Sequence, residues 1–113
     1  MGKRLLTEFG MGTSLRRQDY TQAAVRALKD ALWHNSINLA ELFGVEKEAM
    51  ILTVEIGVQN PDQVDTTVLA EVFPYGQPSF LIVKGGLDIP RADGGKPTVI
   101  ANAAISVALE GVA

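Results

Sequence analysis

The sequence predicts an α/β fold with two layers, in which a mixed four-stranded sheet carries two helices on one of its faces. Residues 50–58 alternate apolar and mixed side chains, as a β-strand does when one face is buried. Residues 20–34 repeat their apolar side chains at helical spacing, and so does the stretch that follows Asn60. Residues 1–113 are expected to form a single domain with the order β-α-β-α-β-β.

The first strand is predicted in residues 5–9, where Leu5, Thr7 and Phe9 alternate with Leu6 and Glu8 as on the two faces of a strand, and the pattern stops at Gly10. The first helix is expected to begin near Asp19, because this carboxylate can accept hydrogen bonds from early helix N–H groups. Gln22, three residues later, can reach back to the cap in a variant of the capping box. A loop should therefore connect Gly10 to Asp19.

The expected loop is a candidate binding site. Its unpaired N–H groups, together with Arg16 and Arg17, would suit an anionic or carbonyl-bearing ligand. The alternative is that Gly10 and Gly12 only permit a tight exit from the strand and that the arginines are solvated. The loop lacks the dinucleotide-binding fingerprint, because Leu15 stands where a third glycine is required.

The second half of the chain supplies the other elements. Asn60 and Pro61 are typical of a helix start, an N-cap residue followed by proline, and Pro74 should end this second helix. Residues 79–84 are almost continuously apolar, as in a strand that is covered on both faces. Residues 85–97 form a long connection rich in Gly, Pro and Asp, either a ligand-facing flap or a surface excursion.

The last segment, residues 98–109, fits two patterns. Its apolar residues alternate as in a strand, whereas Asn102, Ser106 and Glu110 also fit one face of a helix. Because β-branched residues open the segment, we predict a strand.

Composition narrows the class of protein. The net charge of −3 argues against nucleic acid as the main partner, since phosphate binding requires a basic face. No secretory signal and no apolar run of membrane-spanning length occur, so we expect a cytoplasmic protein without membrane contact. There is no cysteine and His34 is the single histidine, so no metal site and no cofactor are predicted, although carboxylates could hold Mg²⁺.

Charge and hydrophobicity both favour self-association. Residues 1–34 carry a net charge of +3 and residues 35–113 one of −6, an asymmetry that favours contact between copies. Two helices cover only one face of the sheet, and the other face would carry small and apolar residues, namely Ile51, Thr53, Gly57, Ala104 and Ala108. Such a face is too apolar to lie in water, so we expect further copies of the chain to cover it.

Three segments carry a family resemblance: residues 8–12, residues 18–24 and residues 84–87. They resemble a small bacterial and plant family of conserved hypothetical proteins without assigned function, and the likeness covers almost the whole chain. That family is marked by a Gly-x-Gly-x-Asp-x-His-Gly signature, which Gly10 and Gly12 match. At the remaining signature positions this chain has Ser14, Arg16 and Arg17 in place of Asp, His and Gly.

The predicted order of elements also resembles a known fold. It is similar to that of the Bacillus-type chorismate mutases, the small reactive-imine deaminases, and single repeats of the amidohydrolases that open cyanuric acid and barbiturate rings. In those families three copies or repeats pack around a common axis, and ligands bind between neighbours. The resemblance implies a homotrimer with a small-molecule site at a subunit interface, and leaves the chemistry open.

Three strands carry a charged residue near an end, and these are the candidate catalytic groups: Glu8, Glu55 and Lys84. Such charges are costly in a packed strand unless they are paired or wet, so we expect them to line a cleft. One hypothesis is hydrolysis or proton transfer on a small carbonyl or carboxylate compound, with Glu55 or Glu8 as base and Lys84 offsetting developing charge. The candidate ligand-binding residues are Gly10, Gly12, Ser14, Arg16, Arg17, Gly85 and Gly86.

The competing hypothesis is that these charged side chains form ion pairs that close an oligomer interface. The protein would then be a non-catalytic ligand-binding or structural trimer. Ser14 as a nucleophile would require a neighbouring base that the sequence does not identify. The residues alone leave both hypotheses open.

Overall fold

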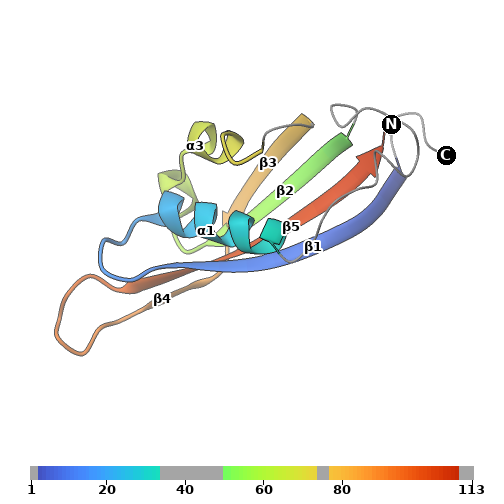
Figure 1. Cartoon of the computed structure of the whole chain (residues 1–113). Helices are drawn as coiled ribbons and strands as arrows, with labels where there is room; N and C mark the ends of the chain where they lie inside the picture. The colour runs from blue at the N-terminus through green and yellow to red at the C-terminus, as the bar shows by residue number, and fades with distance from the viewer. Residues whose placement is uncertain (1–2, 34–49, 74–76, 110–113) are drawn as a thin grey trace.

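The computed structural model describes residues 3–33, 50–73 and 77–109. Figure 1 shows a sheet with helices packed against it. The elements are β1 (Lys3–Ser14), α1 (Tyr20–Trp33), β2 (Met50–Val58), η2 (Pro61–Gln63), α3 (Thr66–Ala70), β3 (Gln77–Lys84), β4 (Leu87–Ile89) and β5 (Thr98–Leu109). The predicted two-layer α/β class is confirmed, and so is the strand over residues 98–109. His34 lies outside the described residues.

The sheet is mixed, with the strand order β1-β5-β2-β3. β5 is antiparallel to both β1 and β2, whereas β2 and β3 are parallel. The first three long strands therefore run in the same direction, but β5 separates β1 from β2. The short strand β4, which the sequence analysis placed inside a long connection, is a fifth strand and pairs with the beginning of β5.

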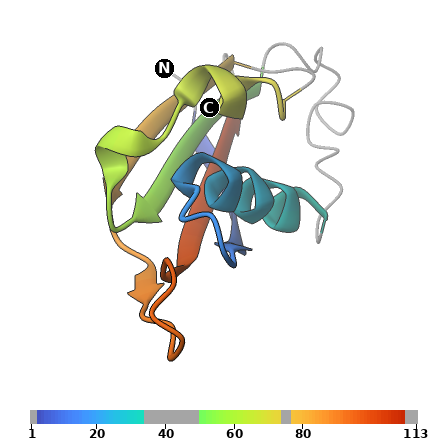
Figure 2. The same ribbon diagram turned by 90° about the vertical axis from the view of Figure 1, so that its left-hand side faces the viewer.

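Alternation along the strands places one apolar face under the helices. The buried side chains of β2 are Leu52, Val54, Ile56 and Val58, and those of β5 are Val99, Ala101, Ala103, Ile105 and Val107. α1 adds mostly small side chains to this core, namely Ala23, Ala24, Ala27, Leu28 and Ala31, together with Tyr20 at its start. Figure 2 shows α1 and α3 on the same side of the sheet, which leaves the opposite face open.

The two glycines of the expected loop lie inside β1, and this corrects the prediction that the strand ends at Gly10. Gly10 pairs with Ala103 and Gly12 with Ala101, and the strand continues to Ser14. A Cβ atom on either glycine would lie 2.3 Å from a backbone carbonyl oxygen of α1. The glycines are therefore required for close approach of helix and strand, because a side chain there would collide with the helix backbone.

The second predicted helix is split into η2 and α3. Val64 is extended between them, and a new helix starts where the Asp65 carboxylate accepts a hydrogen bond of 3.0 Å from the N–H of Thr67. The hydrogen bonds from Thr67 lower the pKa of the Asp65 carboxyl. Asn60, predicted as the N-cap, makes no side-chain cap hydrogen bond, and the NH2 group of its amide donates to the hydroxyl of Tyr20.

Candidate functional site

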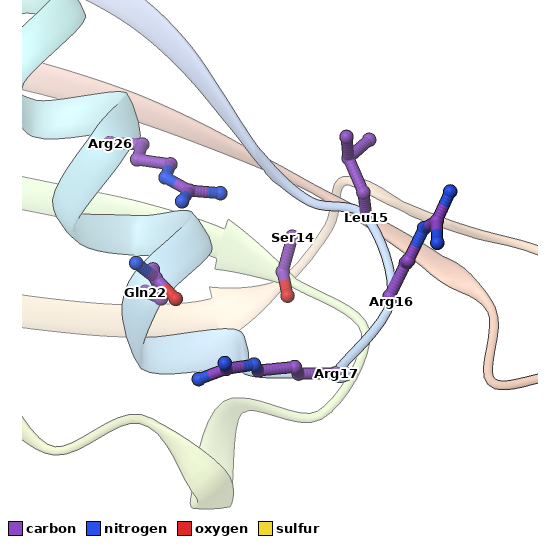
Figure 3. A pocket seen from close by; sticks show the side chains of 6 residues that line it. All are labelled: Ser14, Leu15, Arg16, Arg17, Gln22 and Arg26. Atoms are coloured by element: carbon purple, nitrogen blue, oxygen red, sulfur yellow. The ribbon is translucent and has the colours of Figure 1, made fainter.

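A pocket of about 340 Å³ lies between the end of β1 and the first turns of α1. It is lined by Ser14, Leu15, Arg16, Arg17, Gln22 and Arg26. In Figure 3 the side chains of Gln22 and Arg26 project from α1, while the other four residues come from the strand end and the loop. Arg17 and Arg26 lie on either side of Gln22 in this view, whereas Arg16 extends away from the helix.

Hydrogen bonds hold the loop in a tight turn. The buried hydroxyl of Ser14 accepts the N–H of Asp19 at 3.2 Å, and the Asp19 carboxylate accepts the N–H of Gln22 at 2.9 Å. Asp19 is thus the helix cap that the sequence predicts, although Ser14 and not Gln22 binds the cap N–H. Gln18 adopts a φ of 51°, the left-handed region, which lets the chain reverse between strand and helix.

Arg26 joins α1 to the outer edge of the sheet. Its guanidinium donates a hydrogen bond of 2.7 Å to the carbonyl oxygen of Thr13. One turn further along the helix, the Asp30 carboxylate accepts the N–H of Met11 at 2.9 Å. The hydrogen bond to Thr13 uses one of the five N–H donors of Arg26. The guanidinium therefore lies at the pocket with N–H donors that this bond does not use.

The pocket is strongly cationic. Three of its six lining residues are arginines, and none carries a carboxylate. Among the described residues, an ion pair joins Arg91 to Asp93, at the tip of the β4–β5 hairpin and not at the pocket. The guanidinium fork matches carboxylate and phosphate groups, so the arrangement favours a small anion. The helix N-terminus itself is already occupied by Asp19, so the arginines and not the loop N–H groups supply the binding potential.

Ser14, Arg16 and Arg17 were predicted from the sequence as ligand-binding residues, whereas Gln22 and Arg26 were not. These two residues are four positions apart and therefore share one helix face. Their position on the polar face of α1, directly after the loop that carries Arg16 and Arg17, could have indicated that they belong to the site. What the sequence did not reveal is that β1 runs on to Ser14 and brings the loop back over that face.

A second polar cluster surrounds the hydroxyl of Tyr20, whose side chain is almost fully buried. The hydroxyl accepts hydrogen bonds from the amides of Gln18, at 3.1 Å, and Asn60, at 2.7 Å, and donates one to the Asp88 carboxylate. The second oxygen of Asp88 is buried and has no hydrogen-bond partner in the part of the chain that the structure describes. These hydrogen bonds connect the loop between β1 and α1 to β4 and to the end of β2.

The candidate catalytic residues do not come together within one chain. Glu8 pairs with Ile105, so it lies on the helix-covered face of β1, while Glu55 lies exposed on the opposite face of β2. Lys84 ends β3, at the other edge of the sheet from β1. None of the three lines the arginine pocket. Any joint action of these groups would need residues from another copy.

Gly85 and Gly86 also lie away from the arginine pocket. A Cβ on Gly85 would lie 3.1 Å from the Cα of Gly57, and Gly86 has a φ of +61° with its Cβ position against the Ile100 carbonyl. The Gln59 amide donates to both glycine carbonyls, each at 3.1 Å. The two glycines therefore form the tight link between β3 and β4 and line a shallow hollow on the open face of the sheet.

Fold and pocket together define a small two-layer α/β protein with a cationic pocket between its first strand and first helix. Residues 4–107 match the model of the conserved hypothetical protein family Lin0512_fam, and the chain belongs to this family. The sequence resemblance to a conserved hypothetical family is thereby confirmed. Within residues 3–33, 50–73 and 77–109, no helix has the length and apolar character needed to cross a membrane.

One crystal structure gives a close comparison. It is described as an FtsZ-like protein of unknown function from Nostoc punctiforme, and it is 30% identical to this chain. The alignment covers 97% of this chain and 98% of that one, with a TM-score of 0.86. Among curated proteins, none matches the chain.

Proposed function

We propose that this protein binds a small anion, carrying a carboxylate or phosphate group, in the pocket between β1 and α1. The observation that carries the proposal is the presence of three arginines and no carboxylate around one pocket. Guanidinium groups bind such anions through paired, charge-assisted hydrogen bonds. The Gln22 amide and the remaining donors of Arg26 would complete the coordination of the anion.

The size of the pocket supports a small ligand. Its volume of about 340 Å³ lies at the lower end of the range for small-molecule sites. A phosphate, or a compact molecule with one carboxylate or phosphate head, suits this space. Ser14, Arg16 and Arg17 stand where the signature expected from the sequence resemblance has Asp, His and Gly, so the proposal assigns anion binding to these positions.

Binding is favoured over hydrolysis or proton transfer. A general base must lie within hydrogen-bond reach of the reacting group, and none of the six lining residues is a carboxylate, histidine or lysine. The Ser14 hydroxyl is buried and already accepts a hydrogen bond, without a base beside it in the pocket lining. A catalytic role for Glu8, Glu55 and Lys84 would require an assembly that brings these residues together across subunits.

Calorimetric titration of the protein with inorganic phosphate tests the proposal. The Arg17→Gln variant is expected to bind phosphate about tenfold or more weakly than the wild type, because one charge-assisted contact is lost. Lys96→Gln is the matched control, since it removes one positive charge from an exposed position near the hairpin tip. Equal affinities for Arg17→Gln and wild type, or an equal loss in both variants, would contradict a specific arginine site.

A further inference from the structure

The open face of the sheet gathers most of the exposed large apolar side chains. Among the described residues, seven such side chains are exposed, and five of them lie on this face: Phe9, Met11, Leu81, Leu87 and Ile89. Their strand register places them there, because Phe9 pairs with Ala104 and Leu87 with Ile100, all on the side away from α1. Phe9 is 71% exposed, an unusual state for a phenyl ring in water.

This face has both a protruding side chain and a hollow. Phe9 on β1 and Leu81 on β3 flank a hollow of about 460 Å³, whose floor is formed by Thr53 and Glu55 of β2 and by the small side chains of Ala104 and Ser106 on β5. A neighbouring hollow of about 220 Å³ shares Phe9, Glu55 and Ala104 with the first. A surface with a knob beside a recess can pair with a second copy of itself, each knob entering the other recess.

The available area is sufficient for a stable contact. Nine residues of β2 at about 3.3 Å each, across four strands about 4.8 Å apart, give roughly 570 Å² of sheet surface per copy. Two copies would bury about 1,100 Å², which exceeds the approximately 1,000 Å² expected of a specific interface. The side chains of β4 extend this area further along the same face.

Charge also favours burial of this face. Among its described side chains, Glu55 is the one that carries a charge; the others are apolar, small, amide or hydroxyl side chains. A hydrogen bond of 3.1 Å between the hydroxyls of Thr7 and Ser106 reduces the polarity of the floor. Surfaces that lie in contact with another protein are depleted of charge in this way, whereas surfaces that face water are not.

The outer edge of β1 is less suited to pairing with another strand. Asp30 already binds the N–H of Met11, and Arg26 binds the carbonyl of Thr13. At the opposite edge of the sheet, β3 contains Pro78, which has no N–H to donate. Contact through the face, rather than extension of the sheet, is thus the more favourable mode.

We propose that a second copy of this chain packs its open sheet face against this one, with Phe9 of each copy entering the hollow beside Leu81 of another. The contact hides apolar side chains that one chain leaves in water. The homotrimer implied by the fold resemblance is one closed arrangement of such contacts. This proposal is independent of the anion pocket, which is built from residues of a single chain.

Sedimentation equilibrium of the full chain over a wide dilution range tests the contact. The wild type is expected to sediment at the mass of two or three chains, whereas Phe9→Asp should raise the dissociation constant at least a hundredfold, about 2.7 kcal/mol. Val68→Asp is the matched control, because Val68 is an exposed apolar residue on α3, in the helix layer, and this variant should assemble like the wild type.

Circular dichroism would establish that each variant is folded. If Phe9→Asp does not fold, Leu81→Asp provides the same test from the other side of the hollow. A wild-type protein that stays a single folded chain at the highest concentration would overturn the proposal. So would folded Phe9→Asp or Leu81→Asp variants that assemble as tightly as the wild type.

Discussion

At the scale of residues, alternate glycines in β1 decide how closely the helix layer approaches the sheet. Gly10 and Gly12 face the backbone of α1 at Ala31, Ala27 and Ala23, so backbone meets backbone at these contacts. This close approach places Arg26 over the edge of β1, where it binds the Thr13 carbonyl and reaches the pocket. The glycines thus position the candidate site without lining its pocket.

Gly12→Ala should test this packing role. The new methyl group would lie 2.3 Å from the Ala23 carbonyl oxygen, so helix and strand must separate, at a cost of about 2–3 kcal/mol in the free energy of unfolding. Gly95→Ala is the control, because its nearest atoms belong to the movable side chains of Asp93 and Arg91. Urea denaturation measures both variants, and equal stabilities would argue against the packing role.

Residues of the site were predictable where the chemistry is local. Arg16 and Arg17 follow a glycine-rich segment, and Asp19 is recognisable as a cap from Gln22 three residues later. The Tyr20–Asp88 hydrogen bond joins residues that are 68 positions apart, and no local pattern indicates it. Glycine was misleading because its two uses, flexible turn and close approach, look the same in a single sequence.

At the scale of elements, periodicity predicted α1, β2 and β5 well, because each has one strongly apolar face. β4 was missed since three residues are too few to show a period. The stretch after Asn60 was predicted as one helix, but Asp65 is a good N-cap and starts a second helix after the extended Val64. A strong N-cap residue inside an apolar helical pattern can therefore divide one predicted helix into two.

The Asp65 cap should make α3 sensitive to acid. Hydrogen bonds from Thr67 lower the pKa of Asp65 in the folded chain, so the stability it contributes is present above the unfolded pKa of about 4 and is lost as pH falls through the lowered folded value. Asp65→Asn keeps a capping side chain without the charge. Thermal unfolding at pH 3 and pH 7 should show a smaller acid-induced loss in this variant, and an unchanged loss would contradict the assignment.

At the scale of the whole molecule, the arrangement of strands creates one covered face and one open face. The insertion of β5 between β1 and β2 could not be predicted, because periodicity indicates which face of a strand is buried and not which strand lies next to it. The insertion places Phe9 and Leu81 at either side of the central strands. The exposed apolar face and the cationic pocket are therefore separate surfaces, and we propose the first for assembly and the second for ligand binding.

The most direct test of the account is an amide chemical-shift map recorded while inorganic phosphate is added to the protein. The account predicts saturable shifts confined to the residues around the pocket, from Ser14 to Arg17 and at Gln22 and Arg26, with little change on the open face at Phe9 and Leu81. Shifts that fail to saturate, or that spread evenly over the exposed cations and include Lys96 as strongly as Arg17, would contradict an anion site between β1 and α1.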